Sequence, residues 1–354
     1  MLKCYNRLRM EDIQMKDRTK LTINDIASMS GVSKATVSRV INNTKPVSNE
    51  VRQKVMQVIK DTGYKPSFVA RSLINKETNI IGVIVPDISH EFCSQMVQGV
   101  VDVSNIYNYT MILCNTFSDY DTERQYLEVL SEKEVDGIIF LSYTPSDYHA
   151  DFFENYDKPV VTINRKIESL EFPNVDIDNF NAGYEGAMYF IDGGHERIAF
   201  IGVPPEDLPT GIHRLEGFKK ALKDSQIVHN PDYIKLGDYR AKSGYDKMAE
   251  LMALKTPPTA VFCMNDEMAA GAISYCLKTG IKVPEEVSVM GFDNGKIAEL
   301  FVPHITTLKQ PAFDMGAVAM RLIAKLKENK GKKVESEYLL PYEIITRDST
   351  RRLK

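Results

Sequence analysis

The sequence has few cysteines and no long apolar run. Its five cysteines are odd in number and scattered through 354 residues without a Cys-x-x-Cys pair, which argues against a disulfide framework or a cysteine zinc site. No apolar run approaches 18 residues, and the charged N-terminal segment has no apolar stretch of signal-peptide length. We therefore expect a soluble cytoplasmic protein that is neither exported nor embedded in a membrane.

The motifs of the common enzyme classes are also missing. The sequence contains no GxxxxGKS/T phosphate loop, no HExxH, no GxSxG and no strand followed by GxGxxG. Its six histidines are isolated from one another, so surface or capping roles are favoured over metal ligation. We predict that the protein is not an enzyme and holds neither a metal nor a cofactor.

Charge is present but unevenly distributed. The net charge is −4, yet residues 1–78 contain 15 Lys and Arg against seven Asp and Glu, so the remainder is acidic. A basic head on an acidic body is typical of a polyanion-binding module joined to another domain, although a merely solvated basic terminus would have the same balance. The chain is long enough for two or three domains.

Residues 21–66 have the pattern of a small helical bundle. Thr22 is suited to cap a first helix that ends near Gly31, and Ser33 to cap a second. A third helix is predicted from Ser48 through Asp61. Two short helices joined by a tight turn form a helix-turn-helix, in which the second helix lies in the major groove of DNA.

The outward side chains of the second helix suit a DNA groove. Lys34 and Arg39 can donate to guanine, and Ala35 can pack on a thymine methyl group. Short hydroxyl side chains that can reach phosphates stand beside them: Ser33, Thr36 and Ser38. An ordinary solvated helix is the alternative for this stretch taken by itself.

From residue 79 short apolar strands alternate with helices. The strands are predicted at 80–85, 110–115, 137–142 and 159–164, and again at 197–202, 233–237, 259–264 and 287–292. Continuous apolar strands separated by helices indicate parallel sheets covered on both faces, here in two lobes. Ligands of such proteins lie at the carboxyl ends of the strands, where this sequence has many Asp, Asn, Arg and Tyr residues.

The segments TINDIA, GVSKATVSRVINN, VSNEVRQKV and GYKPSFVARSL resemble the DNA-binding head and hinge of the lactose-repressor (LacI/GalR) family of bacterial transcription regulators. The resemblance implies a homodimer on palindromic operator DNA, because a hinge leucine from each subunit enters the minor groove. It implies the following DNA-binding residues: Thr22, Ser33, Lys34, Ala35, Thr36, Ser38, Arg39, Asn42, Tyr64, Ala70 and Leu73.

The resemblance continues through the body, which is similar to periplasmic sugar-binding proteins. RLEGF, NDEMAAG and GFDN match the family motifs that place an Arg, an Asn and an Asp on the effector, here Arg214, Asn265 and Asp293. Arg214 and Asp293 would form a charged pair that fixes vicinal hydroxyls. Further effector-binding positions are implied at Phe92, Asn164 and Tyr239. A sugar or sugar phosphate is the expected effector.

One branch of the family offers an alternative function. The segment 316–326 and the neighbouring GFDN resemble catabolite control proteins, whose corepressor is a phosphorylated phosphocarrier protein. That branch carries an Arg before a Pro where this sequence has Val302 before Pro303. A small-molecule effector is therefore favoured, with the catabolite-control type as the alternative.

The expected organisation has four parts. We predict a disordered N-terminal extension at 1–20, with Met15 as an alternative start, a helix-turn-helix domain at 21–66, a hinge helix and linker at 67–78, and a body at 79–354. The N-lobe is expected at about 79–175 and 305–333, and the C-lobe at about 176–304 and 334–354. The chain ends without an apolar heptad tail, so a dimer is expected, and a repressor is the expected function.

Overall fold

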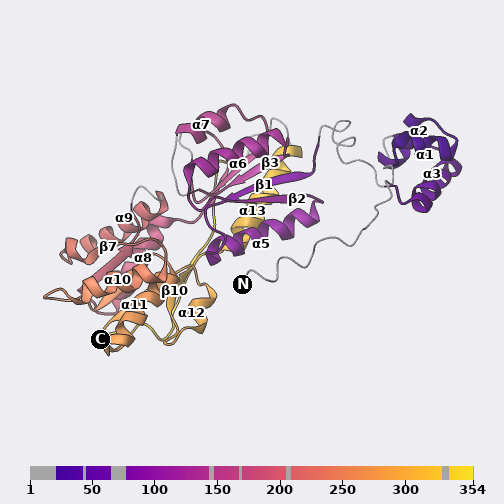
Figure 1. The fold of residues 1–354 in the computed structure, drawn as a ribbon. Helices are drawn as coiled ribbons and strands as arrows, with labels where there is room; N and C mark the ends of the chain where they lie inside the picture. The colour runs from indigo at the N-terminus through magenta and orange to yellow at the C-terminus, as the bar shows by residue number, and fades with distance from the viewer. Residues whose placement is uncertain are drawn as a thin grey trace, which may run out of the picture. The chain divides into compact units, whose positions relative to one another are not determined.

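The computed structural model divides the chain into two compact units, Met1–Thr78 and Asn79–Lys354 (Figure 1). It describes residues 21–42, 45–64, 77–142, 147–166, 170–204, 209–328 and 335–353. The predicted extension at 1–20 and most of the predicted hinge, with Ala70 and Leu73, lie outside the described residues. The two units are described separately below.

The first unit contains the predicted helix-turn-helix. Helix α1 (Ile23–Ser30) is followed by α2 (Lys34–Asn42) and α3 (Asn49–Thr62). Thr22 and Asp25 form a capping box at the start of α1, and Gly31 ends it with a φ of 63°, which permits the tight turn into α2. The small core is formed by apolar side chains from all of these helices: Ile26, Ala27, Val37, Val40 and Val55. The predicted helical bundle is confirmed.

The second unit begins with a parallel sheet that forms one lobe. Its strands are ordered β11 (Glu337–Leu339), β5 (Asn174–Asp176), β4 (Val160–Ile163), β3 (Gly137–Phe140), β1 (Ile80–Val85) and β2 (Thr110–Asn115). Helices α5 (Glu91–Ile106) and α13 (Ala312–Glu328) pack on one face, and α6 (Tyr120–Glu132) and α7 (Asp147–Glu154) on the other. Both faces of the sheet are therefore buried, as the continuous apolar strands predicted.

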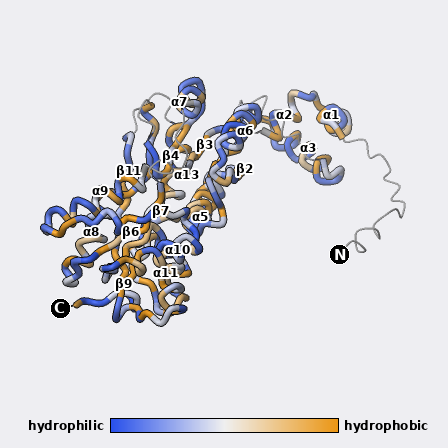
Figure 2. The backbone as a smooth tube through the Cα atoms, turned by 60° about the vertical axis from the view of Figure 1, so that its left-hand side comes forward, coloured by the Kyte–Doolittle hydropathy of each residue, from blue (hydrophilic) through white to orange (hydrophobic). Residues whose placement is uncertain are grey.

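The second lobe repeats this plan. Its strands are ordered β12 (Glu343–Ile345), β10 (Thr306–Lys309), β9 (Ser288–Phe292), β8 (Ala260–Cys263), β6 (Ile198–Gly202) and β7 (Ile234–Leu236). Its helices are α8 (Asn179–Asp192), α9 (Pro209–Asp224), α10 (Ala241–Met252), α11 (Asp266–Thr279), α12 (Lys296–Leu300) and the 3-10 turn η1 (Pro231–Tyr233). The hydrophobic colour in Figure 2 follows the strands at the centre of the lobes.

The predicted lobe boundaries are wrong near the end of the chain. Strand β10, expected in the first lobe, pairs with β9 of the second, and β11, expected in the second lobe, pairs with β5 of the first. Strand β10 was not recognised as part of the second lobe, because its buried residues Thr306 and Thr307 are polar and do not form the apolar run that marks the other strands. The chain crosses between the lobes after β5, after β10 and after β11.

Among the helices in the described residues, none is both long and apolar enough to cross a membrane.

Candidate functional site

A cavity of about 250 Å³ lies between the two lobes. All of the effector-binding positions predicted from the sequence line it: Phe92, Asn164, Arg214, Tyr239, Asn265 and Asp293. Phe92 and Asn164 belong to the first lobe and the other four to the second. The structure thus brings together side chains that are up to 201 positions apart in the sequence.

The backbone at three of these positions has an uncommon conformation. Asn164 follows β4, Tyr239 follows β7 and Asp293 follows β9, with φ values of 55°, 70° and 100°. Positive φ is unfavourable for side chains other than glycine, and least so for Asn and Asp. Such strain persists only where the surrounding structure imposes it, and it concentrates at binding sites. The strand ends are therefore shaped to present these side chains to the cavity.

Arg214 is held rigidly by the second lobe. Its Nε donates to Asn179 Oδ1 at 2.7 Å, its Nη1 donates to the carbonyl of Met264 at 3.3 Å, and its guanidinium lies 3.5 Å from the ring centre of Phe292. Burial raises the pKa of nearby Asp176 to about 6, and the Arg214 charge opposes that rise. The guanidinium is thus already oriented before any ligand binds.

Asp293 was expected to pair with Arg214. Burial raises the pKa of Asp293, and the Arg214 charge is the largest influence that lowers it, so the two groups interact electrostatically. Asp293 also accepts a hydrogen bond from Gln310 Nε2. The sequence analysis did not single out Gln310, which follows β10 and also lines the cavity.

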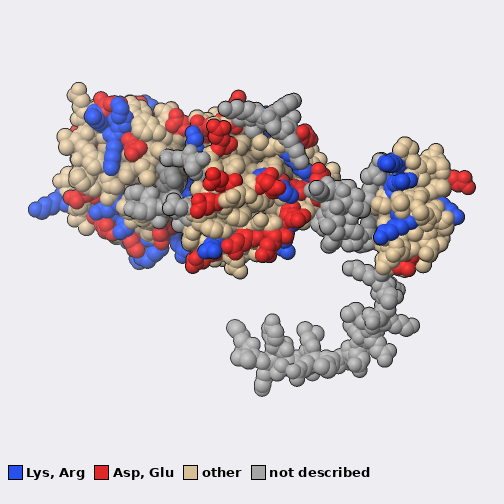
Figure 3. Space-filling view, turned by 90° about the horizontal axis from the view of Figure 1, so that it is seen from above, with Lys and Arg blue, Asp and Glu red and all other residues tan. Residues whose placement is uncertain are grey.

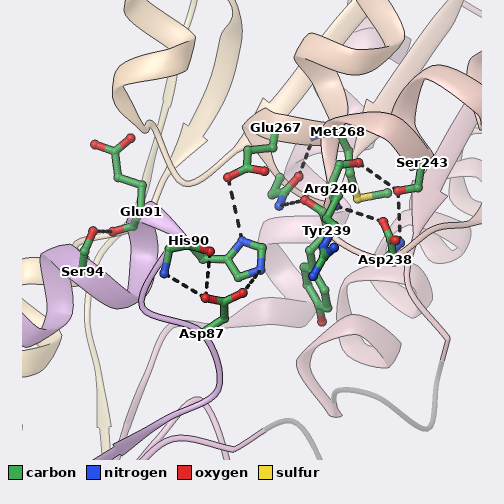
Figure 4. Close-up of polar contacts among 12 residues, drawn as sticks. Asp87, His90, Glu91, Ser94, Asp238, Tyr239, Arg240, Ser243, Glu267 and Met268 are labelled. Atoms are coloured by element: carbon green, nitrogen blue, oxygen red, sulfur yellow. Dashed lines mark hydrogen bonds and ion pairs between the residues drawn. The ribbon is translucent and has the colours of Figure 1, made fainter. Parts of the chain in front are cut away.

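Contacts between the lobes join residues that line the cavity (Figure 4). His90 of the first lobe has Nε2 3.8 Å from Asp87 Oδ2 and Nδ1 3.9 Å from Glu267 Oε1 of the second lobe. The His90 ring also meets the ring of Tyr239 edge-on, with 5.9 Å between centroids. His90 and Glu267 were not predicted, because the polar character of loop residues gives no sign of a partner far away in the sequence, whereas Tyr239 was predicted.

A second contact between the lobes involves Glu91. Its Oε2 accepts a hydrogen bond from the backbone N–H of Lys296 at 2.7 Å, at the start of α12. An acidic group at a helix N-terminus is stabilising. Glu91 therefore ties the first turn of α5 to the opposite lobe.

In the head, α2 presents the predicted DNA-binding side chains. Lys34, Ala35 and Arg39 are exposed, while Thr36 and Ser38 are half-buried. Ser33 accepts a hydrogen bond from the Thr36 N–H at 3.1 Å and so caps the helix, as predicted. Blue basic side chains gather on the head in Figure 3, and the visible face of the body is rich in red acidic ones.

The remaining predicted DNA-binding positions have other surroundings. Tyr64 is half-buried against the core of the head, and burial raises its pKa. The hydroxyl of Thr22 is engaged with Asp25 in the capping box. Asn42 is the last residue of α2, and its side chain lies outside the described residues, as do Ala70 and Leu73.

Comparison with known proteins decides the family. Residues 22–67 match the model of bacterial regulatory proteins of the lacI family, and residues 187–350 match that of a periplasmic binding protein-like domain. The transcriptional regulator RegA of Clostridium acetobutylicum is 42% identical over 331 residues, which cover 93% of this chain and 98% of RegA. The chain belongs to the lacI family. Catabolite control protein A of Priestia megaterium is 38% identical over 332 residues, covering 94% of this chain and 99% of that protein.

Solved structures of lacI-family regulators share the fold. The Lac repressor dimer bound to operator and the anti-inducer ONPF aligns with a TM-score of 0.85 at 25% identity, covering 94% of this chain and 99% of the repressor. A lacI-family regulator from Enterococcus faecium with bound ribose aligns with a TM-score of 0.70 at 32% identity, covering 78% of this chain and all of that one. These likenesses confirm the predicted fold and the prediction of a DNA-binding transcription regulator rather than an enzyme.

Proposed function

We propose that this lacI-family regulator is a repressor that binds a palindromic operator as a homodimer and is controlled by a small carbohydrate bound between its lobes. The observation that carries the proposal is the cavity, which is lined by all of the effector-binding residues expected from the sequence. The protein acts in the cytoplasm, where bacterial operator DNA is found.

The head supports the DNA-binding part of the proposal. Lys34 and Arg39 are exposed basic residues on α2, the helix that enters the major groove in a helix-turn-helix. Arg39 is suited to a bidentate contact with guanine, and Ser33 at the helix start is suited to a phosphate. Leu73 would enter the minor groove at the operator centre, as the family resemblance implies.

The first lobe offers a surface for a second copy of the chain. Strand β2 is an edge strand of its sheet, and apolar side chains around it are exposed: Ile106, Tyr107, Leu113 and Phe117. Exposed apolar groups beside an open sheet edge are typical of a protein interface. The Lac repressor, with the same fold, is a dimer on its operator.

The cavity supports control by a carbohydrate. Arg214, Asn265 and Asp293 are the side-chain types that hydrogen-bond hydroxyl groups, and Tyr239 offers an aromatic face. Because the cavity is formed by both lobes, a ligand bound there changes the relative free energies of their arrangements. That change would reach the two hinges of the dimer and alter operator affinity.

The operator-binding assay tests this function. A palindromic duplex from the promoter region of the protein's own gene should bind with an affinity that falls steeply as salt rises. Arg39→Ala should weaken specific binding about tenfold or more, because a bidentate base contact is lost. Fluorescence anisotropy of the labelled duplex measures both effects. Lys255→Ala, an exposed lysine of the body, is the charge-matched control; equal affinities of the two variants would contradict the proposal.

The catabolite-control type remains the second candidate. The relative of that name is 38% identical, which favours it, whereas Val302 before Pro303 departs from that branch at a position that would read a phosphate. Adding a phosphorylated phosphocarrier protein to the operator assay separates the two candidates, because only the second predicts tighter operator binding.

A further inference from the structure

The cavity contains buried hydrogen-bond acceptors that lack partners. Asn164 Oδ1 and Gln310 Oε1 have no hydrogen-bond partner among the described residues, although each residue is only 4% exposed. Gln310 Nε2 already donates to Asp293, which fixes the amide so that its oxygen remains available. Buried acceptors without a partner cost free energy, and a ligand that donates hydrogen bonds removes that cost.

Two side chains of the cavity use donors on the protein itself. Asn265 Nδ2 donates to the carbonyl of Tyr239 at 2.8 Å, while its Oδ1 caps α11 by accepting from the Met268 N–H. Arg214 donates through Nε to Asn179. The two unpaired acceptors, Asn164 Oδ1 and Gln310 Oε1, suit hydroxyl groups, which can donate, and do not suit phosphate oxygens, which only accept.

The charge of the lining is also unfavourable to an anion. Four carboxyl side chains line the cavity, Glu91, Asp266, Glu267 and Asp293, against the single guanidinium of Arg214 and the imidazole of His90. Burial raises the pKa of Asp266 and Asp293, which reduces their negative charge. Glu91 and Glu267 still contribute negative charge from opposite lobes. A phosphate group carries about −1.5 to −2 charges near neutral pH and would be repelled.

The feature that would attract an anion is compensated. Helix α5 begins at Glu91 in the cavity wall, and a helix N-terminus favours negative charge. Glu91 itself supplies a carboxylate in this first turn, and it is held there by the Lys296 N–H. An acidic side chain of the protein thus already stands at this helix N-terminus, where it opposes the binding of a further anion.

The volume limits the size of the ligand. At about 250 Å³ the cavity lies below the roughly 300–1,000 Å³ common for small-molecule sites. We infer that it selects an uncharged, hydroxyl-rich ligand of monosaccharide size and discriminates against the phosphate ester of the same sugar. This inference rests on the proposed function and narrows the expected class of sugars and sugar phosphates to the unphosphorylated members.

Matched pairs of ligands test the inference on the full chain. Thermal-shift and calorimetric titrations would compare ribose with ribose 5-phosphate, glucose with glucose 6-phosphate, and fructose with fructose 6-phosphate. At least one neutral sugar should bind, and its phosphate ester should bind about 100-fold more weakly. A phosphate ester that binds more tightly than its parent sugar, or no binding by any neutral sugar, would overturn the inference.

Two variants locate the cause of the selectivity. Glu267→Lys should reduce the preference for the neutral sugar over its phosphate ester about tenfold or more, because it reverses one charge in the lining. Glu196→Lys changes an exposed acidic residue that does not line the cavity, and it should leave this preference unchanged. Gln310→Met should weaken binding of the neutral sugar about tenfold by removing an acceptor. Unchanged selectivity in Glu267→Lys, in a protein that melts like the wild type, counts against the inference.

Operator binding by the same preparations separates this inference from the proposed function. If the operator is bound but phosphate esters bind more tightly than the parent sugars, the inferred ligand selectivity is wrong and the proposed DNA-binding function is supported. If a neutral sugar binds but the protein does not bind the operator, the proposed function is wrong and the inferred class of ligand is supported.

Discussion

Asp176 shows how a single residue near the cavity lowers the stability of the protein. It accepts hydrogen bonds from the Ile177 N–H and from Asn179 Nδ2, yet burial raises its pKa from 3.8 to about 6. Because the pKa is higher in the folded state, folding favours the protonated form. Asp176 therefore costs no stability below about pH 3.8, and the folded state loses stability as the pH rises from there through about 6.

Asp176→Asn should remove this pH dependence. The variant should be more stable than the wild type at pH 7.5, by as much as about 3 kcal/mol, and no more stable at pH 4. Melting temperatures of both proteins across this pH range measure the effect. Asp192→Asn, an exposed acidic residue at the end of α8, is the control. A stability difference that is the same at pH 4 and pH 7.5 would sink the assignment.

At this scale the sequence indicates some site residues and not others. Arg214, Asn265 and Asp293 stand in recognisable motifs, and the structure places them in one cavity. Gln310 and His90 could not be found from motifs, because each acts on the cavity together with a partner residue that comes close only in the folded protein. Gln310 meets Asp293 across 17 positions, and His90 meets Glu267 across the two lobes.

At the scale of elements, the packing of α8 on α9 positions Arg214. A Cβ atom on Gly217 of α9 would lie 1.9 Å from the carbonyl oxygen of Phe180 in α8, and one on Gly183 of α8 would lie 2.0 Å from that of Arg214. No side chain fits between backbones this close. The glycines thus permit the approach that lets Arg214 reach Asn179.

Gly217→Ala should force the two helices apart. We expect a loss of about 1–3 kcal/mol of unfolding free energy, or more, and weaker sugar binding because α9 carries Arg214 away from Asn179. Urea unfolding and calorimetric titration of the full chain measure the two effects. Glu216→Ala, an exposed neighbour on α9, should change neither. A Gly217→Ala variant with unchanged stability and affinity would show that the helix contact is not tight.

The elements themselves were predictable to different degrees. The long apolar runs, such as 80–85 and 287–292, form strands within one residue of the predicted ends. Strands β5, β10, β11 and β12 were missed, because each is short, lacks a long apolar run and gains its hydrogen bonds from a strand elsewhere in the sequence. Local pattern carries no information on such pairings.

At the scale of the whole molecule, the proposed dimer depends on the surface beside β2. Leu113→Asp would place a charge on this edge strand, where Leu113 is exposed. Burying an unpaired charge in an interface is unfavourable, so the variant should be a monomer by sedimentation velocity. Its operator affinity should fall about tenfold or more, because the second head then no longer binds as part of the same molecule.

A second exposed apolar residue provides the comparison. Val228 is 90% exposed and lies in the loop after α9, away from β2 in the sequence. Val228→Asp should remain a dimer with unchanged operator affinity. If Leu113→Asp sediments like the wild type, the dimer is formed by another surface.

The repeated crossings of the chain between its lobes also constrain how the protein is made. The first lobe lacks α13 and β11 until residue 339 has been synthesised, and the second lacks β12 until residue 345. Until α13 has been synthesised, the apolar faces of β3 and β4 that it will cover stay open in the nascent chain. Neither lobe can therefore finish folding before these late segments have been synthesised, and an incomplete chain exposes apolar surface that favours aggregation.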